Sequence, residues 1–238
     1  MSRLVLYFRK AFVRAYTRRT RSGRSVQVGG YYDRRAPHRD TQARQAAAGY
    51  SDEHVHAYVR AHRPALKQTV SALDSLVSDL GTVEGRLKAP ESLKGKLEGR
   101  YRGNPIEDAT DIAGTRVTAP TLEKAQEAMH RIERTFKVTE RNDYLEGHPS
   151  GSGYRSVHYI VEVAGRPVEL QVRTPRQTRW ADWAHDTTYK GDVGKAPGVA
   201  EYARGMSDYF HALDRGQTHD AHKPDCPEAL RSQRLCLE

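Results

Sequence analysis

The feature that most constrains the fold is a pair of alternating segments joined by a turn. In residues 168–173 aliphatic side chains alternate with Glu169, Gln171 and Arg173, and residues 155–163 alternate in the same way. Side chains of an extended chain point to opposite faces in turn, so one face of each segment packs while the other carries polar groups. Residues 164–167, Ala-Gly-Arg-Pro, have turn composition. The pattern predicts a β-hairpin that brings His158 and Glu169 onto neighbouring strands.

The rest of the chain alternates between helical and extended patterns. Apolar residues from Leu66 to Leu80 recur at steps of four and three, which predicts a helix, and Pro64 separates it from a shorter helix that starts after Ser51. The other predicted elements are strands at 83–88, 114–118 and 136–139 and helices starting at Pro90, at 122–136 and at 199–213. This order predicts an α/β (α+β) fold, a mixed central β-sheet flanked by helices.

Five short motifs occur in a fixed order. They are Gly-Arg-Leu-Lys-Ala-Pro-Glu-Ser-Leu-Lys-Gly-Lys-Leu at 85–97, Asp-Ile-Ala-Gly-Thr-Arg-Val at 111–117, Gly-Tyr-Arg-Ser-Val-His at 153–158, Glu-Leu-Gln-Val-Arg-Thr at 169–174 and Trp-Ala-Asp-Trp-Ala-His at 180–185. The set resembles the synthetase domain of the RelA/SpoT family, which includes the small alarmone synthetases. The resemblance implies a nucleotidyltransferase-type fold with a nucleotide cleft along the exposed face of the sheet.

The resemblance also implies a reaction. The 3′-hydroxyl of an acceptor ribose would attack the β-phosphorus of ATP, transferring pyrophosphate and releasing AMP. Asp111 and Glu169 match the acids that hold Mg²⁺ in the family, and Glu169 is also the candidate general base. The cations that match ATP contacts are Arg86, Lys88, Lys96, Arg100 and Arg116.

Three residues are assigned to the acceptor. Tyr154 follows Ser-Gly-Ser-Gly, a flexible stretch that would expose its ring, and the matching tyrosine of alarmone synthetases stacks on guanine. His158 and Gln171 would line the same pocket. A satisfied core histidine is the structural alternative for His158.

Two departures from the family pattern concern the identity of the acceptor. The loop before Gly153 usually carries a lysine for the phosphates of GDP or GTP, but residues 149–152 contain none, and Thr178 stands where an asparagine commonly helps read guanine. The resemblance leaves two acceptors: a guanosine nucleotide, as in (p)ppGpp synthesis, or the 3′ CCA end of tRNA, as in toxic members. The two departures count against a free guanosine nucleotide and favour tRNA, which would then be the sole acceptor; other members use adenosine nucleotides. A neutralising antitoxin is one candidate partner for such an enzyme.

Charge and side-chain periodicity divide the chain into three parts. Residues 1–44 contain twelve Lys or Arg and two Asp, a balance of +10, whereas the whole chain carries +9. We therefore expect a basic N-terminal arm at 1–50, a synthetase domain at 51–216 and a polar tail at 217–238. The arm suits contacts with nucleic-acid phosphates and bases, and a solvated terminus is an equal alternative.

Cellular location and cysteine chemistry are also predicted. The chain contains neither an apolar run of bilayer length nor a secretory signal pattern, which predicts a cytoplasmic protein without a membrane partner. Cys226 and Cys236 in the tail are expected to be reduced surface thiols.

A non-enzymatic alternative is a basic nucleic-acid-binding protein whose catalytic site has decayed. The presence of both Asp111 and Glu169 argues against it, because a decayed site would be expected to lose a carboxylate early.

Overall fold

The computed structural model describes residues 11–13, 16–19, 25–28, 31–33, 49–99, 101–189, 192–219 and 221–237. They fall into two compact units, Met1–His56 with Pro90–Ala109, and Ala57–Ala89 with Thr110–Glu238. Helix α2 spans Asp52–Arg60. None of the described helices combines the length and the apolar character that a membrane span requires.

The first unit contains two small antiparallel pairs and a helix. Strand β1 (Ala11–Val13) pairs with β4 (Tyr31–Asp33), and β2 (Tyr16–Arg19) pairs with β3 (Ser25–Val28). Helix α4 (Pro90–Glu98) starts at a proline, as the fixed φ of that residue favours, and is followed by a short 3₁₀ turn, η1 (Ile106–Asp108). Most of the predicted basic arm lies outside the described residues.

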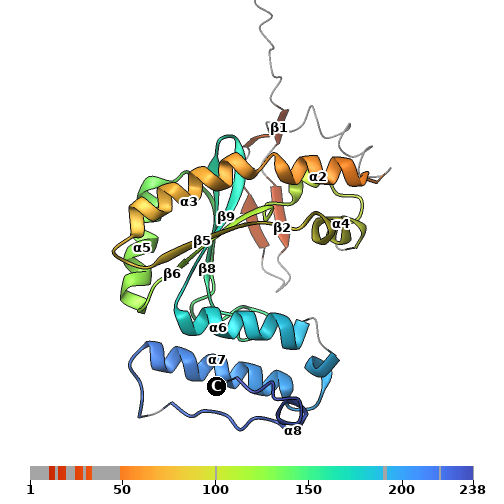
Figure 1. The fold of residues 1–238 in the computed structure, drawn as a ribbon. Helices are drawn as coiled ribbons and strands as arrows, with labels where there is room; N and C mark the ends of the chain where they lie inside the picture. Colours follow the sequence, from red (N-terminus) through yellow and green to blue (C-terminus); the bar gives the residue numbers. More distant parts are fainter. Residues whose placement is uncertain are drawn as a thin grey trace, which may run out of the picture. The chain divides into compact units, whose positions relative to one another are not determined.

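The second unit is built on a five-stranded sheet in the order β5-β6-β9-β8-β7 (Figure 1). The β6–β9 pair is parallel and the other neighbours are antiparallel, so the sheet is mixed as predicted. The strands are β5 (Thr82–Leu87), β6 (Ala113–Thr118), β7 (Val138–Asp143), β8 (Val157–Val163) and β9 (Arg166–Arg173).

Strands β8 and β9 form the predicted hairpin. Its turn is tighter than the four residues expected, because Ala164 and Gly165 alone connect the strands, with φ angles of 49° and 71°. Two positive φ values in succession suit the right-handed twist of a two-residue hairpin. Pro167 lies within β9 but before the part that pairs with β6, so its missing N–H interrupts no ladder between these two strands.

Helices α3 (Arg63–Val77) and α5 (Leu122–Thr135) cover one face of the sheet (Figure 1). Their apolar stripes meet the apolar side of the alternating strands in one core, which includes Leu73, Ile132, Tyr159 and Leu170, each fully buried. A one-residue shift of register would turn the polar side of β9 into this core. The packing of α3 and α5 therefore determines which face of the sheet stays open for chemistry.

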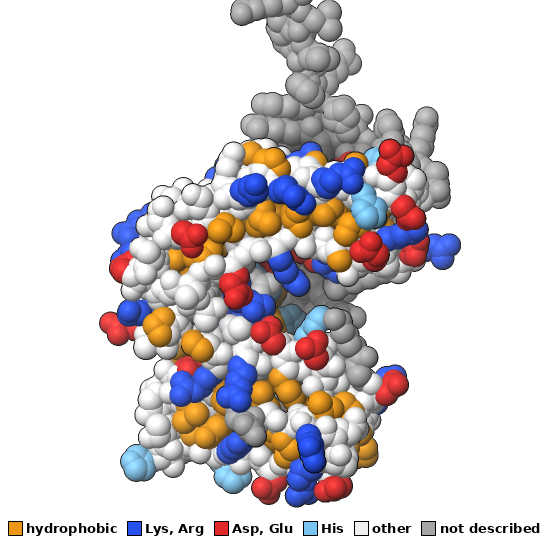
Figure 2. All heavy atoms as spheres, in the orientation of Figure 1, with side chains coloured by type: hydrophobic (Ala, Val, Ile, Leu, Met, Phe, Trp, Pro, Cys, Tyr) orange, Lys and Arg blue, Asp and Glu red, His pale blue; other side chains and the backbone are white. Residues whose placement is uncertain are grey.

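The segment after β9 forms a second layer of packed helices. Helix α6 (Pro175–Ala184) begins with a capping box between Thr174 and Gln177 and continues into a π-helical turn, η2 (His185–Tyr189). After the 3₁₀ turn η3 (Asp192–Lys195), helix α7 (Val199–Asp214) packs alongside α6, and α8 (Glu228–Arg231) lies near the C-terminus. On the face drawn in Figure 2, this layer carries basic and acidic side chains among hydrophobic atoms.

The C-terminal segment corrects two sequence predictions. Leu230 and Leu237 are buried against α6 and α7, so residues 217–237 are not merely a polar tail. Cys226 and Cys236 form a disulfide, and the prediction of two reduced thiols is wrong. The contacts of the segment with the helices, such as the bond from Trp183 Nε1 to the Leu235 carbonyl (2.7 Å), bring the two cysteines together. Sequence spacing alone does not reveal those contacts.

Reduction of this disulfide is expected to lower the free energy of unfolding by about 2–3 kcal/mol, because an open chain has more conformational freedom when unfolded. Urea unfolding with and without dithiothreitol measures the difference. The double variant Cys226→Ser/Cys236→Ser is the control and should not respond to the reductant. Equal unfolding midpoints for the oxidised and reduced natural chain would contradict the prediction.

Candidate active site

The open face of the sheet bears a cavity of about 540 Å³ in the second unit. Its lining comes from β5, β6 and β9, and its charged side chains lie on the face of the sheet opposite α3 and α5. The lining residues are Glu84, Gly85, Arg86, Gly114, Thr115, Arg116, Glu169 and Gln171. Four of the residues predicted from the sequence therefore surround one cavity.

Glu169 is held from both sides of its carboxylate. His158 Nδ1 lies 3.2 Å from one oxygen and Gln171 Nε2 donates to the other at 3.0 Å. Burial raises the pKa of Glu169, but its contacts with His158 and with the amide of Gln171 outweigh burial and leave the pKa below the ordinary glutamate value. The carboxylate is thus ionised at neutral pH, which is the form that a general base requires.

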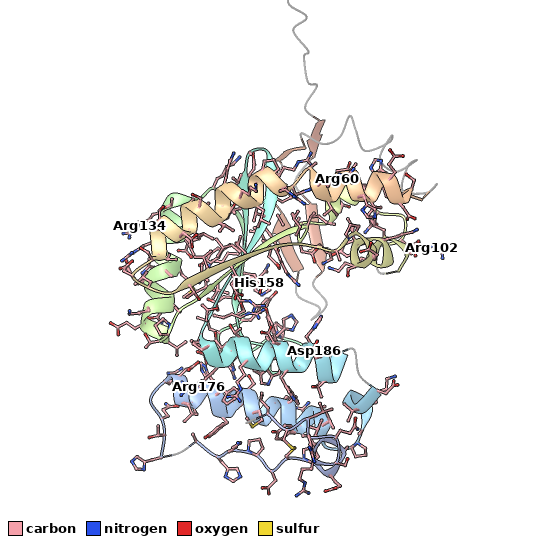
Figure 3. All side chains as sticks on the ribbon, viewed as in Figure 1. Arg60, Arg102, Arg134, His158, Arg176 and Asp186 are labelled. Atoms are coloured by element: carbon pink, nitrogen blue, oxygen red, sulfur yellow. A yellow bond between two sulfur atoms is a disulfide. The ribbon has the colours of Figure 1, made fainter. Side chains whose placement is uncertain are left out.

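His158 connects Glu169 to Tyr154. The Tyr154 hydroxyl lies 2.6 Å from His158 Nε2, and Arg173 in turn donates to the same hydroxyl. One tautomer satisfies the whole chain of contacts: Tyr154 O–H donates to Nε2 and Nδ1–H donates to Glu169. Figure 3 shows His158 on the part of the sheet nearest α6. His158 is therefore a polar residue of the open face and not a core histidine.

The Tyr154 ring is less exposed than the sequence suggested. It is half-buried, its centroid lies 6.4 Å from that of Trp180, and the Arg173 guanidinium lies 5.0 Å from the ring. Burial raises the pKa of the Tyr154 hydroxyl, and the charge of Arg173 opposes that rise. The ring thus lies against neighbours on β9 and α6 and is only partly open to solvent.

Asp111 lies just before β6 and pairs with Lys88 just after β5. Lys88 Nζ is 2.7 Å from Asp111 Oδ2, and the two side chains are 14% and 27% exposed. The antiparallel pairing of β5 and β6 brings these two strand ends together, as the bond from Lys88 N to the Ile112 carbonyl (2.8 Å) shows. Lys88 therefore belongs to the same site as the acids.

Arg116 is oriented by two carboxylates. Its guanidinium lies 3.4 Å from Asp182 Oδ1 on α6 and 3.9 Å from Glu84 Oε2 on β5. Arg86 lies on the neighbouring strand and lines the same cavity. Lys96 lies on α4 in the first unit, and Arg100 lies outside the described residues, so the roles of these two cations stay predictions.

The carboxylates suit a magnesium ion. Asp111 and Glu169 supply oxygen ligands, and the charge of Asp111 raises the pKa of Glu169, so the two groups interact. Within the described part of the chain, no cluster of three or more His, Cys, Asp or Glu side chains is arranged to hold a metal. Mg²⁺ commonly binds through one or two carboxylates completed by substrate phosphates and water, and these two residues fit that pattern.

Sequence reasoning assigned no role to three residues of the site. Arg173 lies on the same side of β9 as Glu169 and Gln171. The alternation of polar and aliphatic residues along this strand was the signal in the sequence that could have identified it. Asp182 lies in the Trp-Ala-Asp-Trp motif, but its contact with Arg116 depends on the packing of α6. Glu84 lies in no motif and becomes visible only through the β5–β6 pairing.

Comparison with known families finds a match that spans most of the site. Residues 85–193 match the model of the family described as the region found in RelA / SpoT proteins. The match contains the residues lining the cavity except Glu84, together with Asp111, Tyr154 and His158.

Two proteins of Bacillus subtilis are among the similar sequences. GTP pyrophosphokinase YjbM is 33% identical over 126 residues, which cover 48% of this chain and 58% of YjbM. GTP pyrophosphokinase YwaC is 26% identical over 149 residues, covering 55% of this chain and 69% of YwaC. The chain thus spans little more than half the length of YjbM.

Solved structures share the fold. The small alarmone synthetase 1 of Bacillus subtilis superimposes with a TM-score of 0.58 and 25% identity over 68% of this chain and 93% of that one. A GTP pyrophosphokinase family protein from Streptococcus pneumoniae superimposes with a TM-score of 0.60 and 25% sequence identity, over 69% of this chain and 92% of that one. The predicted α+β fold is confirmed by these similarities.

Proposed function

We propose that this chain, which carries a RelA/SpoT domain at residues 85–193, is an ATP-dependent pyrophosphokinase that modifies the ribose 3′-hydroxyl of a guanosine nucleotide. The observation that carries the proposal is the placement of Glu169, with its lowered pKa, in a cavity that it shares with Arg86 and Arg116. The printed activities of YjbM and YwaC support the same reaction class.

Each residue of the site has a separate role in the proposed reaction. The acceptor 3′-oxygen attacks the β-phosphorus, the bond from that phosphorus to the α,β-bridging oxygen breaks, and AMP leaves. Glu169 accepts the proton of the attacking hydroxyl, and His158 and Gln171 hold its carboxylate in place. Arg86, Lys88 and Arg116 neutralise the phosphates. Asp111 and Glu169 would hold Mg²⁺, which offsets the charge of the phosphate oxygens.

The acceptor base would lie against the ring of Tyr154, beside His158 and Gln171. The preferred acceptor is GDP or GTP. The tRNA 3′ end is the second candidate, which the basic balance of residues 1–44 favours because a polyanion gains contacts outside the active site. A cytoplasmic location and an antitoxin partner stay predictions; disulfides such as Cys226–Cys236 are uncommon in cytosolic proteins.

Release of labelled AMP from α-labelled ATP, measured with each acceptor in turn, tests the proposal. We expect acceptor-dependent AMP with GDP or GTP, and the corresponding 3′-pyrophosphorylated nucleotide as the second product. Transfer only to deacylated tRNA would select the second acceptor. Transfer only to ADP would contradict both, and absence of AMP with every acceptor in the presence of Mg²⁺ would overturn the proposed function.

A further inference from the structure

We propose that Arg155 and Ser207 are positioning residues for the acceptor, because they fasten the segment 144–155 to helix α7 and thereby place Tyr154. The inference rests on the proposed function for the meaning of Tyr154. The contacts that fasten the segment to α7 do not involve the residues lining the cavity. They join Ser207 to Arg155 and Gly153, which lie more than 50 positions earlier in the sequence.

Arg155 makes three contacts with a side chain that is only 9% exposed. Nη1 donates to the Leu145 carbonyl at 2.6 Å, Nε donates to Ser207 Oγ at 3.2 Å, and Nη2 pairs with Asp208 at 2.7 Å. A buried charge is tolerated only where it is paired and hydrogen-bonded. The Asp208 carboxylate is 68% exposed, so its pair with Arg155 contributes little, and the buried bond to Ser207 is the one that fastens the segment to α7.

Ser207 joins the helix to the residue immediately before Tyr154. Its hydroxyl donates to the Gly153 carbonyl while it accepts from Arg155. Gly153 has a φ of +86°, and a Cβ at this position would lie 3.1 Å from Ser207 Cβ and from Trp180 Cζ2. A side chain at Gly153 would therefore push the segment away from α7.

The other end of the segment lies near the C-terminal end of α7. Glu146 lies 3.6 Å from His211 Nε2 and 3.4 Å from Arg215 Nη1, but its carboxylate is 78% exposed, so these contacts add little to the fastening. Within the segment, His148 N donates to the Tyr154 carbonyl at 2.9 Å, which closes a loop. Tyr154 is thus carried by a loop that Ser207 fastens to α7, and its ring reaches His158 and Arg173 from there.

This arrangement gives α7 a function in acceptor binding although its side chains do not line the cavity described above. If the hydrogen bonds of Ser207 with Arg155 and Gly153 are lost, the residue before Tyr154 is no longer held against α7, while the contacts of Arg86, Lys88 and Arg116 remain. Loss of these hydrogen bonds should consequently weaken acceptor binding and leave ATP binding intact. A purely structural ion pair would affect both equally, or only stability.

The test uses the full chain with Ser207→Ala, which removes one hydroxyl, and Arg155→Lys, which retains the charge but cannot make the forked contacts. The KM for the acceptor should rise about tenfold, the change expected when a hydrogen bond to a charged group is lost, with kcat and the Kd for ATP within about twofold. Glu201→Gln, at an exposed position on α7, is the matched control and should change none of the three.

Hydrogen exchange separates failure of this inference from failure of the proposed function. The amides of residues 146–154 should exchange faster in Ser207→Ala than in the natural chain, whether or not any transfer is detected. Faster exchange combined with a raised acceptor KM supports the positioning role. Unchanged exchange, an unchanged KM or an equal loss of ATP affinity would overturn it.

Discussion

Glu169→Gln is expected to lower kcat by about 10²–10⁴-fold, the usual contribution of a general base. Glutamine has the same shape and can keep one oxygen near His158 Nδ1, so the free energy of unfolding should change by no more than about 1 kcal/mol. Initial rates of AMP release, paired with urea unfolding, measure the two quantities. The loss should lie chiefly in kcat, because the amide removes the proton acceptor, and the Mg²⁺ concentration needed for half-maximal rate should also rise, because Glu169 is assigned to the metal as well.

The matched control is Glu162→Gln on the same hairpin. Glu162 pairs with Lys137 at 2.8 Å and is exposed, so its replacement should leave kcat within about twofold. Near-normal turnover by a folded Glu169→Gln variant would remove Glu169 from the reaction.

Asp111→Asn is expected to lower kcat/KM by about 10³-fold and to raise the Mg²⁺ concentration needed for half-maximal rate. The physical reason is that a carboxylate ligand contributes to several kcal/mol of charge stabilisation in the transition state. Lys88, which now pairs with Asp111 at 2.7 Å, would also face a neutral partner, so the phosphate-binding cations could shift. Rates over a range of Mg²⁺ concentrations separate weaker metal binding from slower chemistry.

Asp79→Asn is the control for this variant. Asp79 is held by two contacts to Arg131, at 2.7 and 3.0 Å, between α5 and the end of α3, on the side of the sheet opposite the cavity. It should lose a small amount of stability and no activity. If both variants lost activity alike, or if Asp111→Asn kept its rate and its Mg²⁺ dependence, the assignment of Asp111 as a metal ligand would be wrong.

Much of the fold follows from local patterns. The alternation of residues 155–173 predicted the β8–β9 hairpin and the outward face of Glu169 and Gln171, and the structure confirms both. The helical stripe from Leu66 predicted α3, which begins near the proline that divides it from α2. Strand ends were less well predicted: the strand expected at 136–139 runs from Val138 to Asp143, because pairing with β8 extends it.

The residues of the candidate site were also predicted only in part from the sequence. Motifs and their resemblance to a family selected Asp111, Tyr154, His158 and Glu169, and the structure brings these residues together around the open face of one sheet. The roles assigned to them stay predictions until the variants are measured. The tail was predicted worst, because its cysteines and its two buried leucines show no periodicity of their own.

The sequence by itself determined the type and order of the elements and the face of each strand that carries polar groups, because side-chain periodicity is a local property of the chain. Only the tertiary structure decided which polar groups become partners. Lys88 and Asp111 are 23 residues apart, and Arg155 and Ser207 are 52 apart. Such pairs depend on how strands pair and how helices pack, and no periodicity in the sequence encodes that packing.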